Sequence, residues 1–330
     1  MPDEQVMPQE LVLHIDGSLD GKRLDVALGQ LIDSHSRSAL SELITRGRVT
    51  LDEKSVTRPS LKVSEGSVVR VLLEQKENEH DLPQDLPLDV IYEDQDILVI
   101  NKGTDFVVHP GAGVRDGTVL NALLFHYPQT KTLNRAGIVH RLDKNTSGLM
   151  VIALSKVAQV RLVAAISKHK VLREYEAIVH GVVTSGGTVR GYMGRDTHNR
   201  VRMAVLPEGM GREAVTHYRV MEKFRAHSRL RLHLETGRTH QIRVHMASID
   251  HPIVGDSTYG SRRARHLKGA SPELDEALVG FGHQALHAVA LELLHPVSKE
   301  KMRFEAPLPE DFERLLRLLR ADFKEHGDGL

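Results

Sequence analysis

The spacing of apolar residues changes repeatedly along the chain and predicts a mixture of helices and strands. Leucines occupy every second position from 230 to 234, between polar residues, which is typical of a strand with one buried face. Continuous apolar runs predict buried strands, and apolar residues at helical spacing over 156–167 predict a helix. Further strands are predicted at 97–100, 148–154, 175–181, 217–224, 288–294 and 302–304, and further helices at 117–125, 239–249 and 309–323. Because strands and helices do not alternate strictly, we expect an α+β fold rather than a doubly wound sheet.

Changes in composition divide the chain into four segments. Residues 1–16 are predicted to be a flexible tail, and residues 17–75 a compact α/β domain. Residues 76–88 are acidic and contain two prolines, which is the composition of a linker. Residues 89–330 then form the main domain.

The segment 17–75 carries its own helix and strand signals. Apolar spacing predicts a helix at 23–31, and a second helix is expected from Ser38 to Thr45, capped by Ser36 or Ser38 and ended by Gly47. Short strands are predicted around 49–56 and at 66–73.

The formal net charge is +0, but the charges are segregated along the chain. Residues 135–245 contain 20 Lys and Arg against 8 Asp and Glu, a net charge of +12, whereas residues 74–96 contain 1 Lys against 9 acids, a net charge of −8. A basic middle segment suits a polyanionic partner such as a nucleic acid. The alternative is that these arginines are spread over a solvated surface.

The chain contains no cysteine, which excludes several reactions. Thiol nucleophiles are excluded, and with them uridine methylation through a cysteine adduct. Cysteine-ligated zinc is excluded as well, and with it the base deaminases that hold zinc through cysteine. The 20 histidines show no ligand spacing that indicates a metal site. Neither an apolar run of 18 residues nor a secretory signal is present, so we expect a cytoplasmic protein.

The densest group of chemically active residues surrounds Asp143. An apolar lead-in, six polar residues and an apolar strand make up the segment 137–153. A loop held by strands is where a catalytic carboxylate can be kept rigid. Arg141 and Lys144 flank Asp143, and positive neighbours favour the ionised form, which suits a nucleophile or base. The alternative is an aspartate that caps a surface turn.

The motifs around this aspartate resemble those of the RluA family of pseudouridine synthases. The N-terminal segment is similar to an S4 RNA-binding domain, and the segments 108–124 and 321–326 look like the RluD branch. The residues 101–103 match an upstream motif, with Gly103 in place of its usual proline. The matching motifs are His140-Arg-Leu-Asp-Lys-Asn-Thr-Ser-Gly148, Arg173-Glu-Tyr-Glu-Ala-Ile-Val-His-Gly181, Leu234-Glu-Thr-Gly-Arg-Thr-His-Gln-Ile-Arg-Val-His-Met246 and His251-Pro-Ile-Val-Gly-Asp256.

The resemblance implies a fold, a reaction and a set of residues. It implies a mixed, largely antiparallel central sheet with flanking helices, and an enzyme that isomerises uridines of 23S ribosomal RNA in the helix 69 stem-loop. Asp143 would be the nucleophile or base, Tyr175 the platform for the flipped base, and Arg243 the partner of Asp143, with Arg238 as its competitor. RNA contacts would come from Arg141, which enters the RNA stack, and from Arg37, Arg46, Arg48, Arg238 and His109.

The implied reaction requires neither a cofactor nor a metal. The partner would be 23S ribosomal RNA or a precursor of the large ribosomal subunit, without a membrane, and we expect a monomer. Two other functions fit part of the sequence. A non-catalytic RNA-binding or ribosome-assembly factor would use the same basic surface, and an RNA glycosylase would use one carboxylate and release uracil.

Overall fold

The computed structural model describes residues 9–32, 37–73, 82–111, 113–197, 199, 202–260 and 267–326. The chain folds as two compact units, Met1–Glu79 and His80–Leu330. Ser36 and the side chain of Ser38, the two candidate helix caps, lie outside the described residues, as do residues 76–81 of the predicted linker. Of the helices in the described ranges, none is long and apolar enough to cross a membrane.

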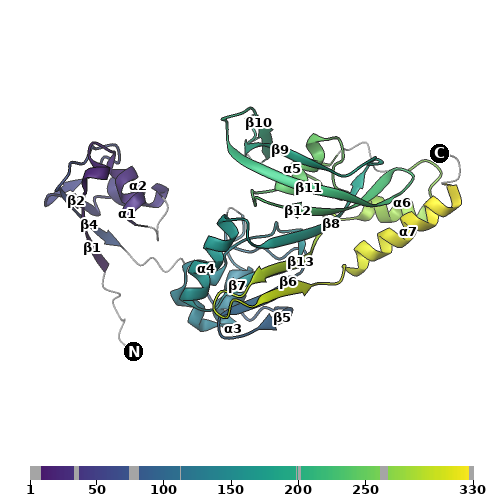
Figure 1. Cartoon of the computed structure of the whole chain (residues 1–330), viewed down its shortest axis with the longest axis horizontal. Coiled ribbons are helices and arrows are strands. Elements are labelled where there is room, and N and C mark those ends of the chain that lie inside the picture. Colours follow the sequence, from purple (N-terminus) through teal and green to yellow (C-terminus); the bar gives the residue numbers. More distant parts are fainter. Residues whose placement is uncertain are drawn as a thin grey trace. The chain divides into compact units, whose positions relative to one another are not determined.

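The N-terminal unit is a four-stranded sheet with two helices beside it (Figure 1). The strand order is β1-β4-β2-β3, and each pair of neighbours is antiparallel. Leu28 and Ile44, one from each helix, are fully buried in its core. The elements are β1 (Gln9–His14), η1 (Gly17–Leu19), α1 (Leu24–Leu31), α2 (Arg37–Thr45), β2 (Val49–Leu51), β3 (Lys54–Val56) and β4 (Val68–Leu73).

The prediction of a flexible tail over residues 1–16 is wrong for its second half. Residues 9–14 form strand β1, which pairs along its whole length with β4. Leu11 and Leu13 pack against the core of the unit, while Val12 between them is exposed. Six residues with only two inward apolar side chains gave too weak a signal to separate a strand from a tail.

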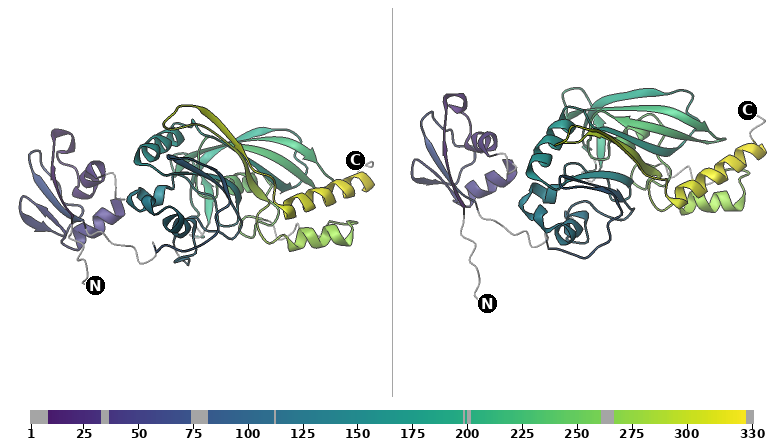
Figure 2. Two further views of the ribbon diagram at one scale, coloured as in Figure 1. Left: turned by 90° about the horizontal axis from the view of Figure 1, so that it is seen from below. Right: turned by 60° about the horizontal axis from the view of Figure 1, so that its bottom comes forward.

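The larger unit is built on one long, twisted sheet (Figure 2). Its strand order is β10-β9-β11-β12-β8-β13-β7-β6-β5, with β14 also paired to β13. Only β13 and β7 run parallel among the paired strands of the described residues, which confirms a mixed, largely antiparallel sheet. The strands are β5 (Val90–Glu93), β6 (Ile97–Lys102), β7 (Ser147–Ala153), β8 (Leu172–His180), β9 (Gly187–Arg195), β10 (Met203–Leu206), β11 (Arg212–Lys223), β12 (His227–Leu234), β13 (Leu286–Leu294) and β14 (Lys301–Glu305).

Helices flank this sheet, and α6 and α7 pack against one another (Figures 1 and 2). Helix α4 spans the predicted residues 156–167, but its apolar stripe points outward: Val157, Val160 and Val163 are about half exposed, while Ala158 and Leu162 are buried. The helices are α3 (Val119–His126), α4 (Lys156–Ser167), α5 (Gln241–Ser248), α6 (Pro272–Gly280) and α7 (Glu310–His326), with short turns η2 (Pro128–Thr132) and η3 (Asn134–Gly137).

The described half of the predicted linker, residues 82–88, contains neither helix nor strand but is fixed to α3. The Asn121 side chain donates to the carbonyl oxygen of Leu82 at 2.8 Å, and the backbone of Gln84 donates to that of Asn121 at 3.0 Å. These residues therefore belong to the larger unit.

Candidate active site

Asp143 lies on the loop between η3 and β7, and both ends of that loop are fixed. At its start, Gly137 has a positive φ of 79°, and a Cβ atom there would come within 1.9 Å of the carbonyl oxygen of Ala153. Only glycine permits this backbone conformation and this close approach together. At the other end, the amide of Thr146 donates to the carbonyl oxygen of Asp143 at 3.1 Å. The carboxylate is therefore carried by a short, rigid loop.

The same loop is also held by a buried lysine, Lys102. We did not predict Lys102 as a site residue. Lys102 ends strand β6 and is only 2% exposed. Its ammonium group donates to the carbonyl oxygens of Gly103, Phe106 and Lys144, at 2.7, 2.9 and 3.0 Å. Burial lowers the pKa of Lys102 to about 7, and the negative charge of Asp143 opposes that shift. Lys102 thus joins the end of β6 to the residue that follows Asp143.

Arg243 holds the Asp143 carboxylate from the opposite side. It lies on α5, is 7% exposed, and its Nη1 is 3.1 Å from Oδ2 of Asp143. Its other nitrogens donate to Asp256, Nε to Oδ2 at 2.7 Å and Nη2 to Oδ1 at 2.9 Å. Burial acts to lower the pKa of Arg243, but the two carboxylates outweigh it and raise that pKa. A permanently charged guanidinium therefore bridges two carboxylates.

The structure distinguishes between the two arginines that could have paired with Asp143. Arg238 donates instead from Nε to the carbonyl oxygen of Glu213 at 3.0 Å. Arg238 still lines the pocket beside Asp143. The expected contact to Asp143 is made by Arg243.

Asp256, which closes the motif 251–256, fixes the orientation of Arg243. Its Oδ1 also accepts hydrogen bonds from the amides of Thr258 and Tyr259, at 2.9 and 3.0 Å. The ring of Tyr259 lies under the Arg243 guanidinium, with the central carbon 5.0 Å from the ring centroid. The planar cation is thus set by two hydrogen bonds and one aromatic face.

His240 presents its second ring nitrogen to Asp143. The hydroxyl of Tyr259 accepts from the amide of Met203 at 2.9 Å and lies 2.8 Å from Nδ1 of His240. Because the hydroxyl can give its own proton to Nδ1, the imidazole proton is assigned to Nε2, which lies 4.0 Å from Oδ1 of Asp143. Burial lowers the pKa of His240, and the charge of Asp143 only partly opposes this. A neutral imidazole therefore faces the carboxylate.

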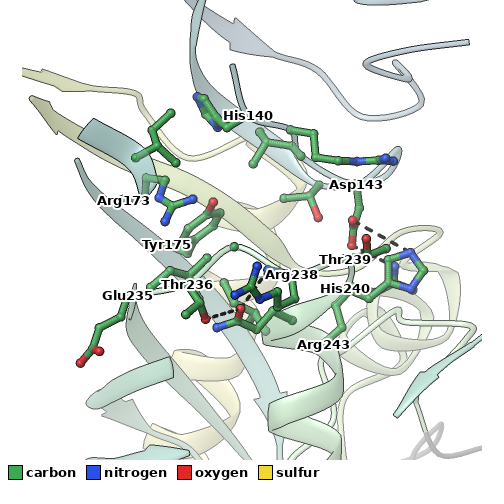
Figure 3. Close-up of a pocket in the computed structure, with 18 of the residues that line it drawn as sticks. His140, Asp143, Arg173, Tyr175, Glu235, Thr236, Arg238, Thr239, His240 and Arg243 are labelled. Carbon is green, nitrogen blue, oxygen red and sulfur yellow. Dashed lines mark hydrogen bonds and ion pairs between the residues drawn. The ribbon is translucent and has the colours of Figure 1, made fainter. Parts of the chain in front are cut away.

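Asp143, His240 and Arg243 border a pocket of about 440 Å³ (Figure 3). Tyr175 on β8 forms part of its wall, is 5% exposed, and has a pKa that is raised by burial. Asp143 is 15% exposed at the side chain, and Arg141 beside it is exposed. The pocket volume lies in the range of small-ligand sites. An aromatic wall, an ionisable carboxylate and several cations suit a polar, planar, anionic substrate such as a nucleotide.

The structure brings five of the predicted site residues to this pocket and leaves four elsewhere. Asp143, Tyr175, Arg243, Arg141 and Arg238 line it. His109 has a buried Nε2, and its pKa falls to about 4 through burial and the charges of Arg135 and Arg141. Arg37, Arg46 and Arg48 belong to the N-terminal unit.

Two of those N-terminal arginines already have acidic partners. Arg37 pairs with Asp25 at 2.8 Å, and Arg46 pairs with Glu42 at 2.5 Å. Their side chains remain about half exposed, at 57% and 47%. Glu42 is also exposed, so its pair with Arg46 is weak and Arg46 can exchange the carboxylate for a phosphate. Asp25 is only 5% exposed at its side chain, so Arg37 is held by a buried carboxylate.

The five pocket residues cannot form a metal centre by themselves, because arginines are not metal ligands. Within the described ranges, no group of three His, Asp or Glu side chains is placed to hold a metal ion. The chemistry of the pocket that the structure shows is that of a carboxylate among cations.

The comparisons with known proteins agree with this geometry. The family model described as RNA pseudouridylate synthase matches residues 96–248, and that of the S4 domain matches residues 22–69. The chain is 53% identical over 318 residues to the ribosomal large subunit pseudouridine synthase D of Vibrio vulnificus strain CMCP6, with 96% of this chain and 97% of that protein covered. It is also 53% identical to the protein of the same name from Escherichia coli strain K12, with 93% and 94% covered.

Two solved structures resemble a large part of this chain. They are the human RNA pseudouridylate synthase domain-containing proteins 4 and 1, with TM-scores of 0.54 and 0.50 and sequence identities of 25% and 26%. They cover 70% and 72% of this chain. The chain belongs to the RNA pseudouridylate synthases, which are enzymes that isomerise uridine in RNA. Within that class it belongs to the family of the ribosomal large subunit pseudouridine synthases D, and the predictions of family, fold and enzyme class are confirmed.

Proposed function

We propose that this enzyme converts uridines of large-subunit (23S) ribosomal RNA, in the helix 69 stem-loop, to pseudouridine, with Asp143 as the reacting carboxylate. The relatives named for the large ribosomal subunit support the choice of RNA. The observation that carries the proposal is the buried Arg243, which holds the Asp143 carboxylate at 3.1 Å in the wall of a pocket that also contains Tyr175.

The reaction requires the target nucleotide to leave its stack. A uridine in a loop is already unpaired, so the free energy needed to flip it is small, a few kcal/mol at most. Arg141, exposed at the pocket, enters the space that the base leaves and stacks on its neighbours. Tyr175 then provides an aromatic face for the flipped uracil.

Asp143 acts next, as a nucleophile or a base at the ribose. The C1′–N1 bond breaks, the uracil turns, and C1′ joins C5. The C5 proton is lost and N1 gains a proton, so that the product is an isomer of the substrate. Arg243 keeps the carboxylate oriented through both steps, while Asp256 keeps Arg243 in place.

The S4 domain contributes affinity rather than chemistry. We assign its RNA contacts to Arg37, Arg46 and Arg48, which lie on or directly after α2. Contacts of this kind to phosphates position an RNA but carry no sequence information. Substituting them is expected to weaken RNA binding and to leave the rate at saturation unchanged.

The test uses purified protein, without added cofactor, and an unmodified helix 69 stem-loop transcript. Pseudouridines in the product are mapped by reverse transcription after carbodiimide treatment. The proposal predicts pseudouridine in the loop and no free uracil. A transcript without pseudouridine in its loop would refute the proposed substrate, and release of uracil would indicate a glycosylase.

A further inference from the structure

Among the described residues, one buried cation of the pocket has no carboxylate partner. Arg173 lies on β8 two residues before Tyr175, so the two side chains project from the same face of the strand, and Figure 3 shows them side by side. Arg173 is 6% exposed and lines the pocket. Its Nε is buried without a hydrogen-bond partner, and in the described part of the chain its guanidinium forms no ion pair.

The nearby carboxylates of the described residues pair with other groups, and Glu213, which also lines the pocket, lies 4.0 Å from Arg190. Glu174 and Glu176, on the other face of β8, pair with arginines on that face. Asp143 is held by Arg243, and Glu235 lies 2.6 Å from the ring of His217. A buried cation without a counter-charge is costly, so an arginine left in this state indicates a ligand that supplies the negative charge.

The backbone at Gly237 leaves room for the guanidinium of Arg173. A Cβ atom on Gly237 would come within 2.7 Å of Nη1 of Arg173, so this glycine leaves the space that the guanidinium fills. The positive charge acts on both neighbouring walls of the pocket. Burial raises the pKa of Tyr175 and the charge of Arg173 opposes that shift, while burial and then Arg173 lower the pKa of His140 to about 3.

We propose that Arg173 is a catalytic residue that donates hydrogen bonds to a carbonyl oxygen of the flipped uracil and stabilises the negative charge that the ring carries after the C1′–N1 bond breaks. The electron pair of that bond stays with the uracil and spreads over its carbonyl oxygens. C5 then uses an electron pair of the ring to form the new bond to C1′. C5 loses its proton, and N1 gains a proton. This inference rests on the proposed use of the pocket as the uridine site.

A phosphate is the other anionic group that an RNA could offer. Arg173 is almost wholly buried beside Tyr175, where a flipped base must enter, whereas the phosphates of a bound RNA stay toward solvent, where Arg141 is exposed. The burial of Arg173 therefore favours the base over the backbone.

The test separates RNA affinity from the rate of the bound complex. Single-turnover rates at saturating enzyme and RNA dissociation constants are measured on the helix 69 transcript for wild type, Arg173→Gln, Arg173→Lys and Gly237→Ala. Loss of one preorganised donor to a developing charge is expected to lower the rate of Arg173→Gln roughly 100-fold. The dissociation constant should stay within about threefold, because the flipped base adds little to the many phosphate contacts. Arg173→Lys should keep part of the rate, and Gly237→Ala should lower it by displacing the guanidinium.

Arg303→Gln is the matched control, because Arg303 pairs with Glu174 on the opposite face of β8 and should leave both quantities unchanged. The melting temperature gives a second readout. Removal of an unpaired buried charge should leave Arg173→Gln at least as stable as wild type, whereas loss of a structural arginine would destabilise it.

Three results would overturn the inference. The first is an Arg173→Gln rate that equals the wild-type rate. The second is an unchanged rate with a raised dissociation constant, which indicates a phosphate contact. The third is a lost rate together with a lowered melting temperature. If wild type does not modify the stem-loop, the proposed substrate fails. The same variants are then compared on complete, unmodified ribosomal RNA, where the rate ratio still tests Arg173.

Discussion

Replacing Asp256 with asparagine tests whether Arg243 must be held from behind in order to act on Asp143. The Asp256 side chain is fully buried and accepts four hydrogen bonds. Its Oδ1 accepts three of them, so an asparagine amide would keep its oxygen there and turn its NH2 group toward Nε of Arg243. Two donors would then face each other at the 2.7 Å contact.

The contacts that Arg243 keeps in Asp256→Asn set the expected loss in the free energy of unfolding. Removing one partner of a buried ion pair costs about 3–5 kcal/mol, and Arg243 keeps its second partner, Asp143, so we expect the lower end, about 3 kcal/mol. Burial alone would raise the pKa of Asp256, but the hydrogen bonds and charge of Arg243 lower it. A carboxyl group with a lowered pKa stabilises the fold above its unfolded pKa and loses that contribution as the pH falls through the folded value. The difference between the two proteins should therefore be full at pH 7 and shrink below about pH 4.

The assay is urea unfolding followed by circular dichroism at several pH values, together with the single-turnover rate. The free energy of unfolding of the larger unit should fall in Asp256→Asn, and the rate should fall with it at temperatures where the variant is folded. A variant that is as stable and as active as wild type at pH 7 would refute the role given to Asp256.

Three further substitutions follow from the same geometry. Tyr175→Phe keeps the aromatic face and removes only the phenol hydroxyl, whose raised pKa makes it a poor base. The single-turnover rate of this variant should therefore stay within about tenfold of wild type, whereas Tyr175→Leu should lose far more. Equal losses of rate in the two variants would mean that the hydroxyl takes part in the reaction. His240→Phe removes the Nε2–H that faces Asp143 and should lower the saturated rate without weakening RNA binding, as measured by filter binding; an unchanged rate would exclude a role for the imidazole. Lys102→Met leaves three carbonyl oxygens without their donor. The free energy of unfolding, measured in urea, should fall by about 1–3 kcal/mol for each oxygen that stays unpaired. An unchanged free energy of unfolding would show that the loop does not need Lys102.

The apolar pattern predicted most of the larger unit because its strands either alternate, as β12 does, or are apolar and buried along their length, as β7 is. The alternation over 230–234 became β12, with all three leucines buried. Strands β9 and β10 were not predicted, since their mostly half-exposed or exposed positions give no clear alternation. Helix α4 was predicted with its correct bounds, but hydrophobicity alone could not show which face is buried, because Ala158 and Leu162 pack in the core with β7 while three valines stay exposed.

The sequence predicted the site residues that lie within one recognisable motif. It did not predict the residues that reach the site only through tertiary contacts. Asp143 and Arg243 are 100 residues apart and were associated through resemblance, not through any local pattern. Lys102, His240 and Asp256 acquire their roles from segments that meet only in the fold. A lone lysine at the end of the apolar strand 97–100 was the one signal that could have indicated the anchor.

The most direct test of the central claim is the single-turnover rate and RNA affinity of Asp143→Asn on unmodified helix 69 RNA. Asparagine keeps the shape of the side chain and can still accept a hydrogen bond from Arg243, but it carries no charge and is neither nucleophile nor base. We predict a dissociation constant close to that of wild type and no detectable pseudouridine. Pseudouridine formed at the wild-type rate would contradict the assignment of Asp143 and the chemistry built on it.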